Sequence, residues 1–138
     1  MTMVGVLVAV MMTLQTVPPG IRRIARDGMS RVDRPRQAVA RTTEEWTTLW
    51  RAHAADTPVP PVDFATTTVA AVFLGERMTA GYHVEIIGTR MDGGALVVQW
   101  SERIPARDRI AAQIITSPAH IVAIPRFAGE IRFEKVDR

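Results

Sequence analysis

Apolar residues between positions 42 and 54 repeat with the period of an α-helix. Trp46, Leu49 and Trp50 stand at i, i+3 and i+4, and His53 follows at i+7. This spacing places them on one face of an amphipathic helix of about twelve residues. Thr42 and Glu45 have the spacing of a capping box, which predicts that the helix begins there. We expect the apolar face to pack on a sheet.

After the Pro-Val-Pro-Pro connector at 58–61, the pattern becomes that of strands. Residues 69–74 are apolar at every position, which predicts a central strand covered on both faces. Residues 82–91 and 95–103 alternate between apolar and polar. The Asp-Gly-Gly sequence at 92–94 favours a tight turn, so these two segments are predicted to pair antiparallel.

Shorter apolar runs complete the predicted sheet. They lie at residues 37–41, 111–116, 120–124 and 131–133, and we expect the last two to form a closing hairpin. One helix followed by short strands separated by turns predicts an α+β domain. In this fold the N-terminal amphipathic helix packs on a mostly antiparallel curled sheet of five to six strands.

The first nineteen residues have a different pattern. Residues 3–12 form an uncharged apolar run, which continues less strongly until Pro-Pro-Gly at 18–20. The run has the length of a signal-peptide core and is shorter than the ~20 residues of a membrane-spanning helix. The alternative is a buried strand of the domain, which its β-branched valines suit. We favour export, with residues 1–19 as a signal peptide or membrane-targeting segment.

Positive charge is concentrated in residues 21–41. This stretch has seven arginines and two aspartates, whereas the whole chain of 138 residues has a net charge of only +3. We interpret residues 20–37 as a basic leader with little regular structure and residues 38–138 as one domain. The domain is slightly acidic and shows no basic stripe, which argues against nucleic-acid binding. The arginine-rich stretch Arg22–Arg41, which contains most of this leader, is a candidate for weak contact with an anionic envelope surface.

No catalytic constellation is evident in the sequence. Cysteine is absent, which removes disulfides and thiolate chemistry, and none of the three serines stands in a Gly-x-Ser-x-Gly elbow. The three histidines lack metal-ligand spacing. A metal site would need His83, Glu85 and His120 to converge after folding. We therefore predict a protein that is not an enzyme and holds no cofactor or metal.

An ordered set of short motifs resembles the PrcB-like protease-complex subunit family over about residues 30–137. The motifs are Arg-Pro-Arg-Gln at 34–37, Glu-Trp-x-x-Leu-Trp at 45–50, Pro-Pro-Val-Asp-Phe at 60–64, Gly-Glu-Arg-Met-Thr-Ala-Gly-Tyr at 75–82 and Thr-Ser-Pro at 116–118. Ala119 and His120 depart from the pattern, because an aromatic residue is expected after the Ser-Pro pair.

The resemblance implies an exported bacterial domain that is periplasmic, secreted or on the cell surface. Its implied role is to bind a secreted or surface protease, or another envelope protein, and the namesake subunit helps to stabilise its protease. The candidate partner-binding residues are Arg77, Thr79, Gly81 and Tyr82. Gly81 permits unusual backbone angles, and Tyr82 offers the amphipathic surface common at interfaces. The other interpretation of Tyr82 is the start of an inward strand face.

Two other functions stay open. Thr-Ala-Gly-Tyr at 79–82 is similar to a loop of chagasin-type cysteine protease inhibitors, so this loop is a candidate inhibitory segment. The second alternative is an envelope metalloenzyme that uses His83, Glu85 and His120. Inhibition predicts that protease activity falls when the domain is added, and the metalloenzyme requires a bound metal.

Overall fold

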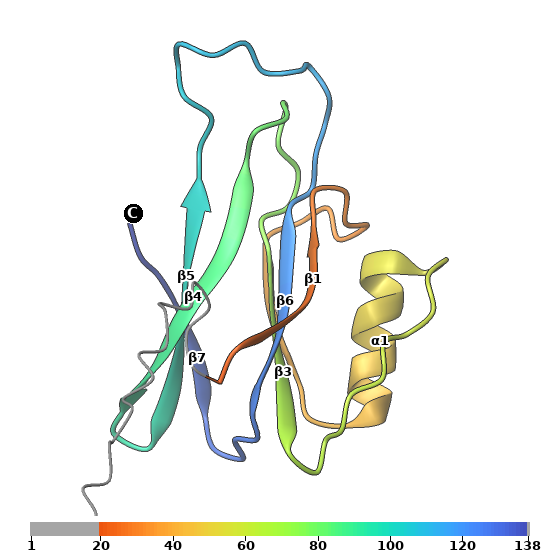
Figure 1. Cartoon of the computed structure of the whole chain (residues 1–138), viewed down its shortest axis with the longest axis vertical. Coiled ribbons are helices and arrows are strands. Elements are labelled where there is room, and N and C mark those ends of the chain that lie inside the picture. The colour runs from red at the N-terminus through yellow and green to blue at the C-terminus, as the bar shows by residue number, and fades with distance from the viewer. Residues whose placement is uncertain (1–19, 138) are drawn as a thin grey trace, which may run out of the picture.

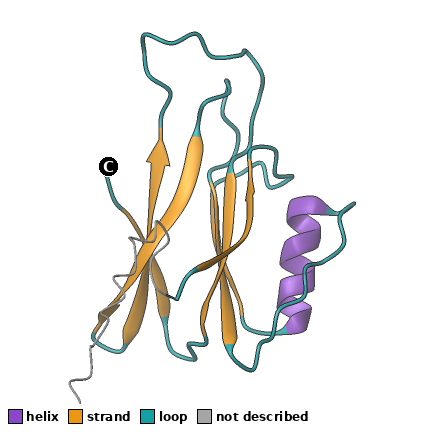
Figure 2. Ribbon diagram, in the orientation of Figure 1, coloured by secondary structure: helices purple, strands orange, loops and turns teal. Residues whose placement is uncertain are grey.

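The computed structural model describes residues 20–137, and the predicted signal segment lies outside this range. The described residues form seven strands and one helix (Figure 2). In chain order these are β1 (Arg22–Asp27), β2 (Arg36–Ala40), α1 (Thr43–Ala54), β3 (Thr67–Phe73), β4 (His83–Asp92), β5 (Ala95–Arg103), β6 (Ala119–Pro125) and β7 (Ile131–Lys135).

The strands form two sheets, and α1 covers the outer side of the larger one (Figure 1). The larger sheet has the order β1-β6-β3-β2, with every neighbouring pair antiparallel. The smaller sheet has the order β4-β5-β7. Its β4–β5 pair is antiparallel, whereas β5 and β7 run parallel. The architecture therefore has three layers: sheet, sheet and helix.

The two central strands of the larger sheet, β3 and β6, are buried on both faces. Even-numbered residues such as Val72 and Val122 pack against Val84 and Trp100 of the smaller sheet. Odd-numbered residues belong to a second core, shared with the helix. Because successive side chains of a strand point to opposite faces, two adjacent strands supply both cores.

The helix confirms the predicted amphipathic pattern. Trp46, Leu49, Trp50 and His53 are its buried residues, and Thr42 caps the first turn by accepting from the N–H of Glu45. The carboxylate of Glu45 accepts from the N–H one residue before the cap. The indole N–H groups of Trp46 and Trp50 donate to the carbonyls of Pro60 and Thr57, which satisfies these polar atoms at the edge of the core.

The predicted fold class, an α+β domain with one curled sheet, is wrong. The described chain is mostly β, with two sheets of four and three strands and a single helix at 43–54. The expected single curled sheet fails because β3 and β6 both need cover on two faces. The helix covers one face, so a second sheet must cover the other.

Three local predictions also need correction. Residues 22–27, predicted as a leader without regular structure, form β1, which pairs with β6. Residues 111–116, predicted as a strand, belong to the long connection between β5 and β6. The predicted closing hairpin does not form, because β6 lies inside the larger sheet and β7 pairs with β5. The predicted 82–91 and 95–103 hairpin is confirmed as β4 and β5.

His120 connects the two sheets. Its imidazole projects from β6, and its Nδ1 accepts a 2.8 Å hydrogen bond from the N–H of Ile86 on the edge strand β4. The residue is only 4% exposed, and its Nε2 has no hydrogen-bond partner among the described residues. Burial, followed by the charges of Arg23 and Arg26, lowers the pKa of His120 from 6.5 to about 4. The fold therefore favours the neutral ring.

This pKa predicts that the protein loses stability in mild acid. Between pH 6.5 and 4 the unfolded chain binds the proton more readily than the folded chain, so stability falls as the pH falls. The loss reaches its full size of about 3 kcal/mol only below pH 4. Urea unfolding at pH 7 and pH 4.5 measures most of this loss. His120→Gln keeps a hydrogen-bond acceptor without a titratable ring, so its stability should depend less on pH. Equal pH dependence in both proteins would refute this role.

Candidate functional site

Three connections gather at one end of the two sheets, and we call this region the loop end. They are residues 28–35 between β1 and β2, residues 74–82 between β3 and β4, and residues 104–118 between β5 and β6. Figure 1 shows the last two extending beyond the strands. They meet here because the register places the end of β3 opposite the start of β6 and the start of β4 opposite the end of β5.

Backbone hydrogen bonds hold the three connections together. Arg77 and Thr116 exchange two bonds of 2.8 and 2.9 Å, and the N–H of Ala80 donates to the carbonyl of Ala112. The N–H of Ser30 donates to the carbonyl of Ser117. These bonds fix residues 112–117, the second half of the long connection, against its two neighbours.

The loop end carries most of the exposed large apolar side chains of the described chain. They are Met29, Met78, Ile104, Ile110, Ile114 and Ile115, while Met91 lies at the opposite end, near the end of β4. Exposed apolar surface is common on proteins, but its concentration on neighbouring loops marks a candidate interaction surface. Ile110 is fully exposed to solvent.

Arg77, one of the predicted partner-binding residues, forms its hydrogen bonds with other residues of the same chain. Its Nε donates to Glu102 at 2.9 Å, and Nη1 donates to the carbonyls of Leu74 and Glu76. The guanidinium also lies 5.7 Å from the centre of the Tyr82 ring. Arg77 therefore holds the 74–82 connection in place, and a partner would meet this side chain only where it is exposed.

The other three predicted residues lie along the same connection. The carbonyl of Thr79 accepts from the hydroxyl of Thr116, which joins this loop to the long connection. Gly81 has a φ of +97°, as its predicted role requires. Tyr82 is partly buried and precedes the inward-facing Val84. The structure brings all four predicted residues to the loop end, and their partner binding stays a prediction.

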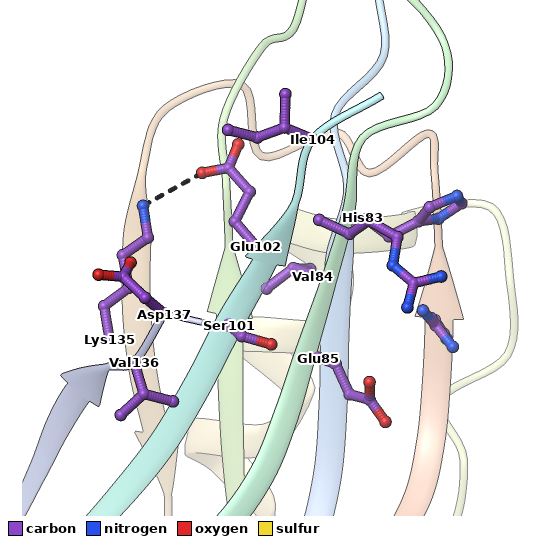
Figure 3. A pocket seen from close by; sticks show the side chains of 11 residues that line it. His83, Val84, Glu85, Ser101, Glu102, Ile104, Lys135, Val136 and Asp137 are labelled. Atoms are coloured by element: carbon purple, nitrogen blue, oxygen red, sulfur yellow. Dashed lines mark hydrogen bonds and ion pairs between the residues drawn. The ribbon is translucent and has the colours of Figure 1, made fainter. Parts of the chain in front are cut away.

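Glu102 anchors the loop end to the smaller sheet. Its side chain is 9% exposed, and its carboxylate accepts from Arg77 through one oxygen and from Lys135 through the other. Figure 3 shows the Lys135 contact at the rim of a hollow of about 740 Å³, which other carboxylates also line. Burial alone raises the pKa of Glu102, but the hydrogen bonds and charges of the two cations outweigh burial and lower this pKa below its usual value.

A serine, a histidine and an aspartate meet behind the loop end. His53 Nδ1 lies 2.7 Å from Ser30 Oγ, and His53 Nε2 lies 3.8 Å from a carboxylate oxygen of Asp27. Ser30 is 6% exposed and its hydroxyl also accepts from the N–H of Val32, so the hydroxyl is not presented to a substrate. Burial lowers the pKa of His53 more than Asp27 raises it. The contacts join the 28–35 connection to the helix.

The suggested metal ligands do not converge in the described residues. His83 is exposed at the start of β4, whereas His120 is buried with its Nδ1 engaged by Ile86. Within residues 20–137, no group of three or more histidine, aspartate or glutamate side chains could hold a metal ion. No helix of this part of the chain is long and apolar enough to cross a membrane.

The exposed connection formed by residues 104–118 did not follow from the sequence pattern. Residues 111–116 were predicted as a strand, because a short apolar run does not by itself distinguish a strand from an exposed loop. Two features of the sequence indicate a loop here: a proline near each end, Pro105 and Pro118, and the lack of alternation between apolar and polar residues from one to the other.

These features define a β-sandwich with an outer helix and an apolar loop end. Residues 68–125 match the family model described as PrcB C-terminal, which confirms the predicted resemblance over these residues. The match covers β3 to β6 with the 74–82 and 104–118 connections, and the three earlier motifs lie outside it. No curated protein and no solved structure matches the chain.

The role of Glu102 can be tested by Glu102→Gln, with Glu134→Gln as the control. The first change leaves Arg77 and Lys135 without their shared carboxylate, so we expect the free energy of unfolding to fall by about 1–3 kcal/mol. The Glu134 side chain is 39% exposed and pairs with Arg90, which is 44% exposed, so its loss should have the smaller effect. Urea unfolding at pH 7 measures both. A larger effect of Glu134→Gln would contradict this assignment.

Proposed function

We propose that this protein is a non-catalytic, exported subunit that binds a protease or another component of a protease complex through its loop end. The family match supports association with a protease complex and includes two of the three connections of the loop end. The observation that carries the proposal is the group of six exposed methionine and isoleucine side chains on connections that are hydrogen-bonded to one another.

The exposed apolar side chains and the ordered base of the loop end favour binding at this end rather than elsewhere. Burying an exposed isoleucine against a partner is favourable in proportion to the apolar area removed from water. The base of the loop end is already ordered by the Arg77–Thr116 pair and the Ala80–Ala112 bond. A preordered surface loses less conformational entropy when a partner binds. The buried Ser30 hydroxyl supports a role without catalysis.

Site-specific photocrosslinking in the native organism tests the proposal. Benzoylphenylalanine replaces Ile110 or Met78 at the loop end, and Met91 at the opposite end provides the matched control. We expect both loop-end positions to crosslink to one protein, identified by mass spectrometry as a protease or a component of its complex, and position 91 not to do so. Equal crosslinking from position 91, or none from the loop end, would refute the proposal.

Protease activity then separates a subunit from an inhibitor. Addition of the purified protein to the crosslinked protease should leave its activity unchanged or lengthen its lifetime. A fall in activity proportional to the amount added would replace the subunit with the chagasin-like inhibitor, acting through residues 79–82.

A further inference from the structure

A groove runs between the 74–82 and 104–118 connections. Its volume is about 650 Å³, and it is lined by residues from both connections and from the adjoining ends of β4 and β5. The lining residues with reactive or bulky side chains are His83, Arg103, Ile104, Arg109 and Ile110. We call this feature the loop-end groove.

Gly81 fixes the close approach of the two walls. A Cβ added at this position would lie 2.9 Å from Cγ of Pro105, which is closer than side chains pack, and the φ of +97° also disfavours other residues. The Ala80–Ala112 hydrogen bond connects the same walls. The shape of the groove therefore follows from the fold before any partner binds.

The charge of the groove is one-sided. Arg103, Arg109 and His83 line it, and none of its lining residues is a carboxylate. Among residues 20–137, neither arginine side chain has an ion-pair or hydrogen-bond partner. The hollow of Figure 3 shares Arg103 and His83 with the groove but differs in its other lining residues, which include two glutamates and an aspartate. Two unpaired guanidinium groups beside apolar surface favour an anionic ligand with an apolar part.

We propose that the loop-end groove binds an extended segment of the partner protein that carries a carboxylate next to apolar side chains. The proposal rests on the proposed function and adds the chemistry of the partner. Arg103 and Arg109 hold the carboxylate through their N–H groups, and Ile104 and Ile110 cover the apolar side chains. Ile104 is 66% exposed in the unbound protein, so contact with an apolar side chain would remove substantial area from water.

Fluorescence anisotropy with the full chain tests this chemistry. The probe is a fluorescein-labelled peptide of alternating leucine and aspartate with an amidated C-terminus, and the matched peptide has asparagine in place of aspartate. The aspartate peptide should bind about tenfold more tightly. A third peptide, the asparagine peptide with a free C-terminus, shows whether a terminal carboxylate serves equally well. Either carboxylate source supports the proposal.

Variants then locate the binding site. Arg103→Gln and Arg109→Gln should each weaken binding of the aspartate peptide about tenfold. Arg107→Gln is the matched control, since it removes the same charge from the same connection at a residue that does not line the groove. Ile110→Ser should weaken binding of both peptides alike. All of these side chains are exposed, and circular dichroism checks that each variant folds.

Three results would overturn the groove assignment. One is equal binding of the aspartate and asparagine peptides by the unmodified protein. Another is an equal effect of Arg107→Gln and Arg109→Gln, which would show attraction to net charge alone. The last is displacement of the peptide by phosphatidylglycerol vesicles and not by phosphatidylcholine vesicles, which would assign the arginines to an anionic membrane surface.

The two proposals fail separately. Crosslinking from Ile110 and Met78 depends on which end of the molecule meets the partner and does not require either arginine. Retained crosslinks without a carboxylate preference would refute only the groove chemistry. Loss of loop-end crosslinks would refute the proposed function.

Discussion

The pairing of β3 with β6 is the interaction on which the rest of the structure depends. Both strands are apolar on each face, so neither can lie at a surface without exposing a row of valine, isoleucine and phenylalanine side chains. The helix covers one face of the pair through Trp46 and Trp50, and the smaller sheet covers the other through Val84 and Trp100. The order of layers follows from this requirement for cover on two sides.

The same pair determines where the loop end lies. β3 leads into the 74–82 connection, and β6 begins where the 104–118 connection ends, so the two connections leave the core side by side. Arg77 forms an ion pair with Glu102 of the smaller sheet, and His120 of β6 accepts a hydrogen bond from the N–H of Ile86. These contacts between the layers hold the ends of the strands from which the 74–82 and 104–118 connections extend. The proposed binding surface is therefore a consequence of how the core is covered.

Local sequence patterns predicted the elements whose structure is local. The helix over 43–54 and the β4–β5 hairpin follow from the Thr42 cap, the tryptophan spacing and the glycine turn. The number of sheets depends on long-range pairing, which a short window does not contain, so the parallel β5–β7 pair and the placement of β1 were missed. One wall of the candidate site, residues 77–82, was found from its motif. The opposite wall was missed because Ile114 and Ile115 have the same local pattern in an exposed loop as in a strand.

Native-state hydrogen exchange measures the central claim most directly. If the doubly covered β3–β6 pair holds all three layers together, its amides should exchange only when the whole molecule unfolds. The smaller sheet and the helix should then lose their protection no later than that pair. Amides in the middle of the 104–118 connection should exchange rapidly, while Arg77 and Thr116 at its base stay protected. Retention of protection in β4, β5 and β7 after β3 and β6 have exchanged would contradict the account.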